Sequence, residues 1–253
     1  MNSFKHALRG PDMVLGAWLE LGSCNVAEVM VANGWDILII DGEHGPGGLE
    51  DWVTLSRTVT AAGGTPILRL PDADETMIKR ALDRGFKNFV VPMINTAEHA
   101  KQVVSAFYYP PRGHRGYAAP VVRGSGWGSD TAYATHTSHH DLTIMLQCEH
   151  IEAVENIDAI CAVDGIDAIF IGPNDLAASA GYLERLDAPE VLSLLARIEA
   201  AAKTANMPLA TVRSAGRDWA DLRALGYNFV AGAGDVGMLA EAAMREAALA
   251  KQS

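Results

Sequence analysis

Short apolar runs recur along the chain at a regular interval. Each run is bounded by turn-forming or acidic residues, a pattern typical of strands that are buried on both faces of a parallel sheet. The runs predict eight strands, at residues 14–21, 36–40, 66–70, 88–93, 143–147, 167–171, 208–212 and 228–231.

Helical patterns fill the gaps between the runs. Apolar residues repeat at helical spacing in residues 25–33, 48–62, 75–84, 96–106, 151–163, 188–205, 216–225 and 236–251. Eight alternating strand–helix pairs without a linker favour an α/β fold, a single (β/α)8 TIM barrel with parallel strands that forms one domain over residues 1–253. The alternative is a doubly wound open sheet, but residues 20–24 match its glycine-rich nucleotide turn poorly.

Composition narrows the functional classes. The net charge of −11 argues against binding to nucleic acid or to an anionic membrane surface. No apolar run approaches the roughly 18 residues that a membrane span needs. The three cysteines, Cys24, Cys148 and Cys161, are odd in number and form no CxxC motif, which indicates reduced thiols in a cytoplasmic protein.

One long segment, residues 107–141, matches neither pattern. It is rich in aromatic residues, arginine and proline, so we expect an ordered loop of functional importance. Because it precedes the fifth strand, it enters the barrel from the amino-terminal face, and we expect it to serve a neighbouring subunit. The histidines of THTSHHD lie on that same face, where a solvated loop is favoured over a metal site.

Polar residues follow several predicted strands at their carboxyl ends. In (β/α)8 barrels the chemistry is located at this end of the strands. The residues that converge there are Glu20, Asp41, Glu43, His44, Arg69, Gln147, Glu149, Gly172 to Asp175, Arg213 and Asp235.

Glu149 and Asp175 are the candidate metal ligands. They follow two neighbouring strands, with Gln147 close by, and such an oxygen-rich set suits a hard divalent cation. The alternative for Asp175 is a simple cap on the helix that follows. Glu149 needs a partner to be tolerated near a barrel mouth, which favours the metal.

Arg69 and His44 are the candidate catalytic residues. Arg69 ends a buried strand, where a cation is costly unless it faces an anion, so it either binds a substrate oxygen or forms a structural ion pair with Asp41 or Glu43. His44 is either a general acid–base, with Asp83 as its orienting carboxylate, or a hydrogen-bonded histidine at the rim.

The Gly172-Pro173-Asn174 turn is a candidate anion site. Backbone amides at the start of a helix can bind a carboxylate or a phosphate, although an ordinary tight turn is the alternative. No lysine ends a predicted strand, which disfavours a Schiff-base mechanism.

These stretches together resemble the HpcH/HpaI aldolase family of metal-dependent class II pyruvate aldolases. The matching segments are LGAWLELGS, DILIIDGEHGP, PILRL, ALDRGFKNFVVPMINTAEHA, YYPPRGHRGY, IMLQCE and IDAIFIGPNDLAASAGY. They occur in the family's order over residues 14–182, with a weaker match through ALGYNFVAGAGD.

The resemblance implies a particular site. Mg²⁺, Mn²⁺ or Co²⁺ would be held by Glu149 and Asp175, Arg69 would bind the donor's oxygen, and His44 with Asp83 would be the acid–base pair. Substrate-binding roles are assigned to Gln147, Gly172, Pro173, Asn174, Asp41 and Ser125. The resemblance also implies a homohexamer in which the last helix packs on a neighbour. Asn174 and Gly126, beside Ser125, depart from the residues that are frequent in the family, and both changes affect the aldehyde pocket.

The implied activity is that of an aldehyde-lyase. It cleaves 4-hydroxy-2-oxo acids reversibly to pyruvate or hydroxypyruvate and an aldehyde, through an enolate that the metal stabilises. Either His44 or a hydroxide on the metal would remove the 4-hydroxyl proton. The alternatives are a citrate- or malyl-CoA-lyase-like enzyme acting on acyl-CoA esters and a non-catalytic barrel. Neither nucleic acid nor a membrane is an expected partner.

Overall fold

The computed structural model describes residues 2–214 and 216–252. Its strands are all parallel and close into one barrel, in which each strand pairs with the next along the chain and β8 returns to β1. The strands are β1 (Val14–Leu19), β2 (Ile37–Asp41), β3 (Thr65–Arg69), β4 (Asn88–Val91), β5 (Thr143–Cys148), β6 (Ala168–Ile171), β7 (Leu209–Val212) and β8 (Phe229–Gly234). The predicted (β/α)8 barrel is confirmed.

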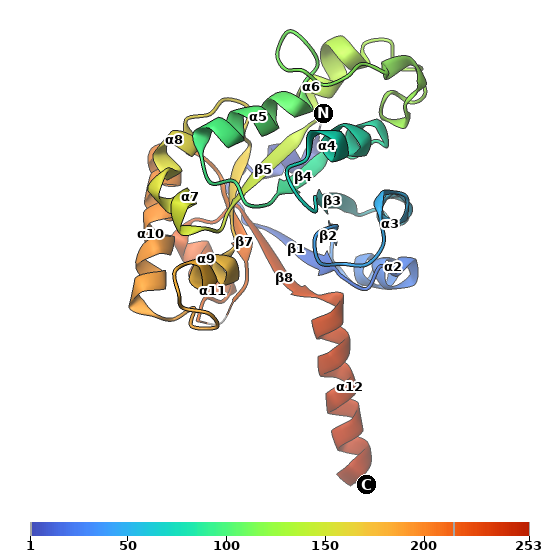
Figure 1. Ribbon diagram of the computed structural model, residues 1–253. Coiled ribbons are helices and arrows are strands. Elements are labelled where there is room, and N and C mark those ends of the chain that lie inside the picture. The colour runs from blue at the N-terminus through green and yellow to red at the C-terminus, as the bar shows by residue number, and fades with distance from the viewer. Residues whose placement is uncertain (1, 215, 253) are drawn as a thin grey trace.

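Helices cover the outside of the barrel between consecutive strands (Figure 1). The helices that lie between strands are α2 (Cys24–Ala32), α3 (Leu49–Ala61), α4 (Glu75–Asp83), α5 (Ala97–Phe107), α6 (Ser138–His140), α7 (Ile151–Glu155), α8 (Ile157–Cys161), α9 (Pro173–Ser179), α10 (Pro189–Thr204) and α11 (Trp219–Leu225). Helix α1 (Ser3–Ala7) precedes β1 and helix α12 (Asp235–Gln252) follows β8. Two short 3₁₀ helices, η1 (Ala119–Val121) and η2 (Arg123–Ser125), and a π-helix, η3 (Tyr133–Thr137), lie between α5 and α6.

The helices between the strands differ from the sequence-based expectation in two places. The helix expected at residues 151–163 is divided into α7 and α8 at Asn156, whose side-chain amide donates to the carbonyl oxygens of Asn95 at 3.1 Å and Glu152 at 3.0 Å. The helix start considered for the Gly172-Pro173-Asn174 turn is present, and it begins a separate short helix, α9, in which Pro173 occupies the first helical position.

The short helix α1, which the hydrophobic pattern did not predict, closes the amino-terminal end of the barrel. Phe4 and Leu8 are buried among the residues that fill the barrel interior, and the ring of Phe4 meets that of Phe229 edge-on at 5.2 Å. Asn2 caps the helix and donates to the side chains of Asn88 and Thr143. The first residues of the chain therefore form part of the core.

Residues 108–142 form a compact lobe at the same amino-terminal end, next to α1 (Figure 1). Tyr109 and Tyr133 pack on the guanidinium of Arg115, which forms an ion pair with Asp83 at 2.8 Å. Arg123 donates to the carbonyl oxygen of Arg84 at 2.7 Å. These contacts attach the lobe to the end of α4, and they agree with the expectation of an ordered loop on this face.

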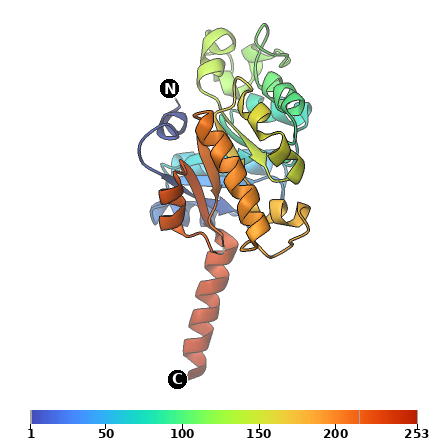
Figure 2. The same cartoon turned by 90° about the vertical axis from the view of Figure 1, so that its left-hand side faces the viewer.

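The last helix, α12, leaves the body of the molecule instead of covering the barrel. It begins at the carboxyl end of β8 and extends away from the strands (Figures 1 and 2). Its exposed apolar residues include Val236, Leu239, Met244 and Leu249. Across residues 2–214 and 216–252, no helix has the length and apolar character that a membrane crossing requires.

We expect Phe4 to contribute strongly to stability, because truncating a buried phenylalanine removes apolar contacts and leaves a cavity. Phe4→Ala should lower the free energy of unfolding by about 3–5 kcal/mol, measured by urea denaturation. His6→Ala, an exposed position on the same helix, is the matched control and should change it by less than about 0.5 kcal/mol. A loss below about 1 kcal/mol for Phe4→Ala would show that α1 is not part of the core.

Candidate active site

The alternation of side chains along the strands places a set of polar side chains at the carboxyl end of the barrel, which is called the mouth below. Trp18, Ile39, Ile67, Met145 and Phe170 point into the barrel interior. Because side chains alternate between the two faces of a strand, the residue two positions further along points to the same side. That rule places Glu20, Asp41, Arg69, Gln147 and Gly172 around the mouth.

Arg69 is held rigidly at this mouth by two carboxylates. Its Nε and Nη2 donate to the two oxygens of Asp41 at 2.9 and 2.6 Å, and Nη1 lies 2.9 Å from Oε2 of Glu43. The guanidinium also stacks over the ring of Trp18, with 4.5 Å from Cζ to the centroid. The structural ion pair considered from the sequence is therefore present. Two guanidinium N–H groups remain for another partner, since five are available in all.

Within the described residues, the side chain of Asp41 makes hydrogen bonds only to Arg69 and to the turn that follows β2. Its Oδ1 also accepts from the backbone N–H groups of Glu43 at 3.0 Å and His44 at 3.2 Å. Burial alone would raise the pKa of Asp41, but the hydrogen bond and the charge of Arg69 outweigh burial and lower it. Both oxygens are occupied, so the contribution of Asp41 is to fix Arg69 and to shape the turn that carries His44. The direct substrate contact assigned to Asp41 stays a prediction.

Glu149 is buried two strands further around the mouth, just after the end of β5. Its exposed fraction is 2%, and Oε1 accepts from the backbone N–H of Met93 at 2.9 Å. Met93 donates from a left-handed backbone conformation with φ of 56°, which is unusual for a residue with a side chain. Oε2 accepts from the side-chain amide of Gln147. The pKa of Glu149 is raised to about 7, mainly by burial, and the nearby charge of Asp175 contributes in the same direction.

Gly172 leaves the room that this carboxylate needs. A Cβ at position 172 would overlap Oε2 of Glu149 and would lie 3.1 Å from Nε2 of Gln147. The next two residues, Pro173 and Asn174, begin α9, and Asp175 is exposed in its first turn. The structure thus brings the end of β5 and the start of α9 together, as the sequence predicted.

The donor set fits a hard divalent cation. Glu149 and Asp175 supply two carboxylates, and Oε1 of Gln147 is buried without a hydrogen-bond partner. A carboxyl group whose pKa is raised to about 7 lacks a compensating positive charge, which a cation would provide. Within the described part of the chain, no cluster of three or more histidine, cysteine, aspartate or glutamate side chains could hold a metal ion. Water and substrate oxygens would therefore be needed to complete the coordination shell.

His44 and Asp83 are far apart within one chain. The His44 side chain is 70% exposed at the rim, with Nε2 4.0 Å from Oε2 of Glu43. Asp83 ends α4, and because helices run antiparallel to the strands, that end lies beside the amino-terminal lobe, where Asp83 pairs with Arg115. The predicted pairing is therefore not formed in this chain, and only a contact between two chains would allow it.

Ser125 is also away from the mouth. It lies in η2 within the amino-terminal lobe, where its hydroxyl donates to the carbonyl oxygens of Ala119 and Val122 and accepts from the N–H of Gly128. These contacts stabilise the lobe. The substrate-binding role assigned to Ser125 is not supported within one chain, because loop residues that precede β5 lie at the wrong end of the barrel.

Comparison with known proteins identifies the family. The model of the HpcH/HpaI aldolase/citrate lyase family matches residues 15–242. The chain belongs to this family. The resemblance noted from the motifs is confirmed, and the match includes every strand except the first residue of β1.

Two relatives have names that describe an activity. The hydroxypyruvate/pyruvate aldolase of Agrobacterium fabrum is 40% identical over 210 residues, which cover 81% of this chain and 79% of the relative. The 2-keto-3-deoxy-L-rhamnonate aldolase of Salmonella gallinarum is 41% identical over 208 residues, covering 81% and 78%. A crystal structure of a family protein from Burkholderia cenocepacia J2315 superimposes with a TM-score of 0.92 at 34% identity and covers all of both chains.

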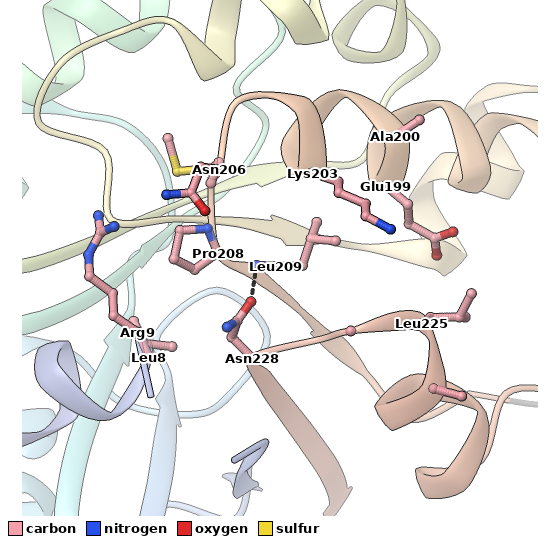
Figure 3. A pocket seen from close by; sticks show the side chains of 13 residues that line it. Leu8, Arg9, Glu199, Ala200, Lys203, Asn206, Pro208, Leu209, Leu225 and Asn228 are labelled. Carbon is pink, nitrogen blue, oxygen red and sulfur yellow. Dashed lines mark hydrogen bonds between the residues drawn. The ribbon is translucent and has the colours of Figure 1, made fainter. Parts of the chain in front are cut away.

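The amino-terminal face of the barrel has a pocket that is separate from the mouth. A pocket of about 540 Å³ lies between α10, α11 and the starts of β7 and β8 (Figure 3). Arg9 and Lys203 line it, while Glu199 forms an ion pair with Arg217 and accepts from the hydroxyl of Tyr227 at 2.7 Å. None of the predicted site residues lines this pocket. The candidate site is therefore the mouth at the carboxyl end of the barrel.

Glu149 makes the stability of the metal-free protein depend on pH. Its pKa rises from an ordinary value of 4.5 to about 7 on folding, so between these values the folded state keeps a proton that the unfolded chain has released. The free energy of unfolding should therefore fall as pH rises through this window, by about 2–3 kcal/mol from this group. Urea denaturation in EDTA at pH 5 and pH 8 measures the change.

Two variants isolate the contribution of Glu149 to this pH dependence. Glu149→Gln should remove most of the difference that we assign to this group, whereas Glu152→Gln, an exposed carboxylate on the following helix, should leave it unchanged. An equal pH dependence in wild type and Glu149→Gln would contradict the assignment.

Proposed function

We propose that this protein is a divalent-metal-dependent aldolase. It reversibly cleaves 4-hydroxy-2-oxo acids to pyruvate or hydroxypyruvate and an aldehyde. The observation that carries the proposal is the pair of carboxylates, Glu149 and Asp175, at the same barrel mouth as a rigid guanidinium, Arg69. Two relatives with about 40% identity are named as aldolases, and one name gives hydroxypyruvate and pyruvate.

Different residues of the mouth bind different parts of the donor, which is the 2-oxo acid. Glu149 and Asp175 hold the cation, and Gln147 contributes its free Oε1. The two unused N–H groups of Arg69 bind the oxygen on which negative charge develops. Backbone N–H groups at the start of α9, after Gly172, are directed at the donor carboxylate. When bound, Mg²⁺, Mn²⁺ or Co²⁺ supplies a Lewis acid that stabilises this charge.

His44 is proposed to carry the proton. In cleavage the 4-hydroxyl group loses a proton, the C3–C4 bond breaks to leave the aldehyde, and its electron pair remains with the pyruvate part as an enolate, which takes up a proton at C3 to become pyruvate. His44 is exposed at the rim beside Glu43, where a substrate hydroxyl group has access to its ring. In the condensation direction the same ring returns the proton.

We also propose a reducing, cytoplasmic environment. All three cysteines are free thiols, and Cys148 and Cys161 are buried. Burial raises the pKa of Cys161 to about 11, so this thiol is kept protonated and unreactive.

The projecting helix α12 indicates self-association. A hollow of about 340 Å³ lies where α2 meets the first turn of α12, and apolar residues line most of it, including Val26, Val29 and Met30. Large exposed apolar side chains on a helix that contacts the body only through its first turn are unusual for a monomer. We propose that α12 of a second copy occupies this surface, within the homohexamer that the family resemblance implies.

The first prediction for this proposal concerns metal and proton transfer. Pyruvate release from a panel of 4-hydroxy-2-oxo acids should stop in EDTA and return when Mn²⁺ or Mg²⁺ is restored. His44→Ala should lower kcat by about 10²- to 10⁴-fold, with His6→Ala at the far end of the barrel as the unaffected control. Near-normal cleavage by His44→Ala would show that His44 is not the essential base.

The same panel decides between the proposal and its alternative. Cleavage of acyl-CoA thioesters without cleavage of any 4-hydroxy-2-oxo acid would favour a citrate- or malyl-CoA-lyase-like enzyme. Activity that persists after complete removal of metal would overturn the roles given to Glu149 and Asp175.

The second prediction concerns assembly. Leu239→Glu places a charge among the exposed apolar residues of α12 and should reduce the molar mass in solution, measured by light scattering, because burying an unpaired charge is unfavourable. Lys251→Glu makes a charge change at the exposed end of the same helix and should leave the mass unchanged. A monomeric wild-type protein would contradict the proposed docking.

A further inference from the structure

We propose that Glu20 determines which aldehyde this enzyme accepts, selecting neutral hydroxylated aldehydes and rejecting those that carry a carboxylate. The inference rests on the proposed aldolase function and deepens it. Glu20 has no role in the donor site proposed above.

Glu20 is fixed at the mouth by its backbone. It follows β1 directly, two positions after the inward-facing Trp18, and its N–H donates to Oδ1 of the buried Asp235 at 2.9 Å. The carboxylate lies over the end of β8, because its Oε2 occupies the space that a Cβ at Gly234 would fill. The side chain is only partly exposed. It thus forms one wall of the mouth.

The carboxylate of Glu20 has free acceptor oxygens. Asp41 and Glu43 share the positive charge of Arg69, whereas Glu20 has neither a hydrogen bond nor an ion pair to its side chain within residues 2–214 and 216–252. Burial is the main cause that raises the pKa of Glu20; the charges of Asp41 and Asp235 also raise it, and those of Arg69 and His44 lower it.

Glu20 lies on the side of the mouth where the acceptor aldehyde would bind, and not on the side where the donor would bind. In the closed strand order β1 lies four positions from β5, so Glu20 faces Glu149 from the opposite wall of the mouth. A donor held by Glu149, Asp175 and Arg69 occupies the β3, β5 and β6 side. The aldehyde part of a 4-hydroxy-2-oxo acid must then extend toward β1 and β8, where Glu20 is located.

The free carboxylate of Glu20 determines the preference between neutral and anionic aldehydes. It accepts hydrogen bonds from hydroxyl groups of the aldehyde and repels a second carboxylate through the poorly screened space of the mouth. Of the positive groups near this rim, Arg69 is already shared by two carboxylates, His44 lies beside Glu43, and Arg213 lies exposed with its guanidinium 5.9 Å from the Trp219 ring. A neutral hydroxyaldehyde is therefore the expected partner.

The test compares two acceptors of equal carbon number in the condensation direction. Metal-loaded full-length enzyme is given pyruvate with glycolaldehyde, which is neutral and hydroxylated, or with glyoxylate, which is anionic, and kcat/KM is measured for each. Wild type should favour glycolaldehyde. Glu20→Gln should shift the ratio toward glyoxylate by about tenfold, mainly through a gain on glyoxylate, and Glu20→Asp should retain the wild-type preference.

Two controls separate the possible failures. Glu28→Gln removes the same charge from an exposed position on α2 and should not change the ratio. Exchange of the pyruvate methyl protons with deuterated water, followed by NMR, reports enolate formation without any aldehyde. Exchange present in all variants with an unchanged ratio in Glu20→Gln would overturn the role of Glu20. No exchange in wild type with Mg²⁺, Mn²⁺ or Co²⁺ would overturn the aldolase function itself, and the inference with it.

Discussion

The ion pair between Arg69 and Asp41 is the constraint on which the mouth of the barrel depends. Both groups are almost completely buried, and such a pair is maintained only where the geometry satisfies most of its hydrogen bonds. Here Asp41 accepts from both the guanidinium and the turn that carries His44. One carboxylate therefore sets the position of a cationic group and shapes the turn that carries His44, the proposed proton carrier, which links the ends of β2 and β3.

The rest of the site follows from how charge is distributed around this pair. Arg69 compensates Asp41 and Glu43, whereas Glu149, two strands away at the end of β5, has a pKa raised to about 7. The β5 and β6 side thus favours a divalent cation, while the β1 side keeps the unshared carboxylate of Glu20. The mouth has two electrostatically different halves, one suited to a charged donor and one to an uncharged acceptor.

Much of this arrangement could be predicted from the sequence, because it depends on local rules. The strands follow from their apolar runs, and the alternation of side chains places Arg69, Gln147 and Glu149 on one rim. Contacts between distant segments could not be predicted in this way. Within one chain, Asp83 pairs with Arg115 of a lobe whose packing no periodic pattern describes, so its expected pairing with His44 stays a prediction. The hydroxyl of Ser125 is likewise used inside that lobe, and its expected role in substrate binding also stays a prediction.

The helix at the start of the chain has a consequence for folding. Phe4 packs against Phe229, and β1 pairs with β8, so the first and last parts of the sequence meet in the same core. On a ribosome the first residues emerge long before their partner strand has been synthesised. The barrel can therefore close only when nearly the whole chain is available, and contacts between residues so far apart in sequence make that closure slow. Until then, the unpaired backbone N–H and C=O groups at the edges of β1 and of the last completed strand remain open to contacts with other chains.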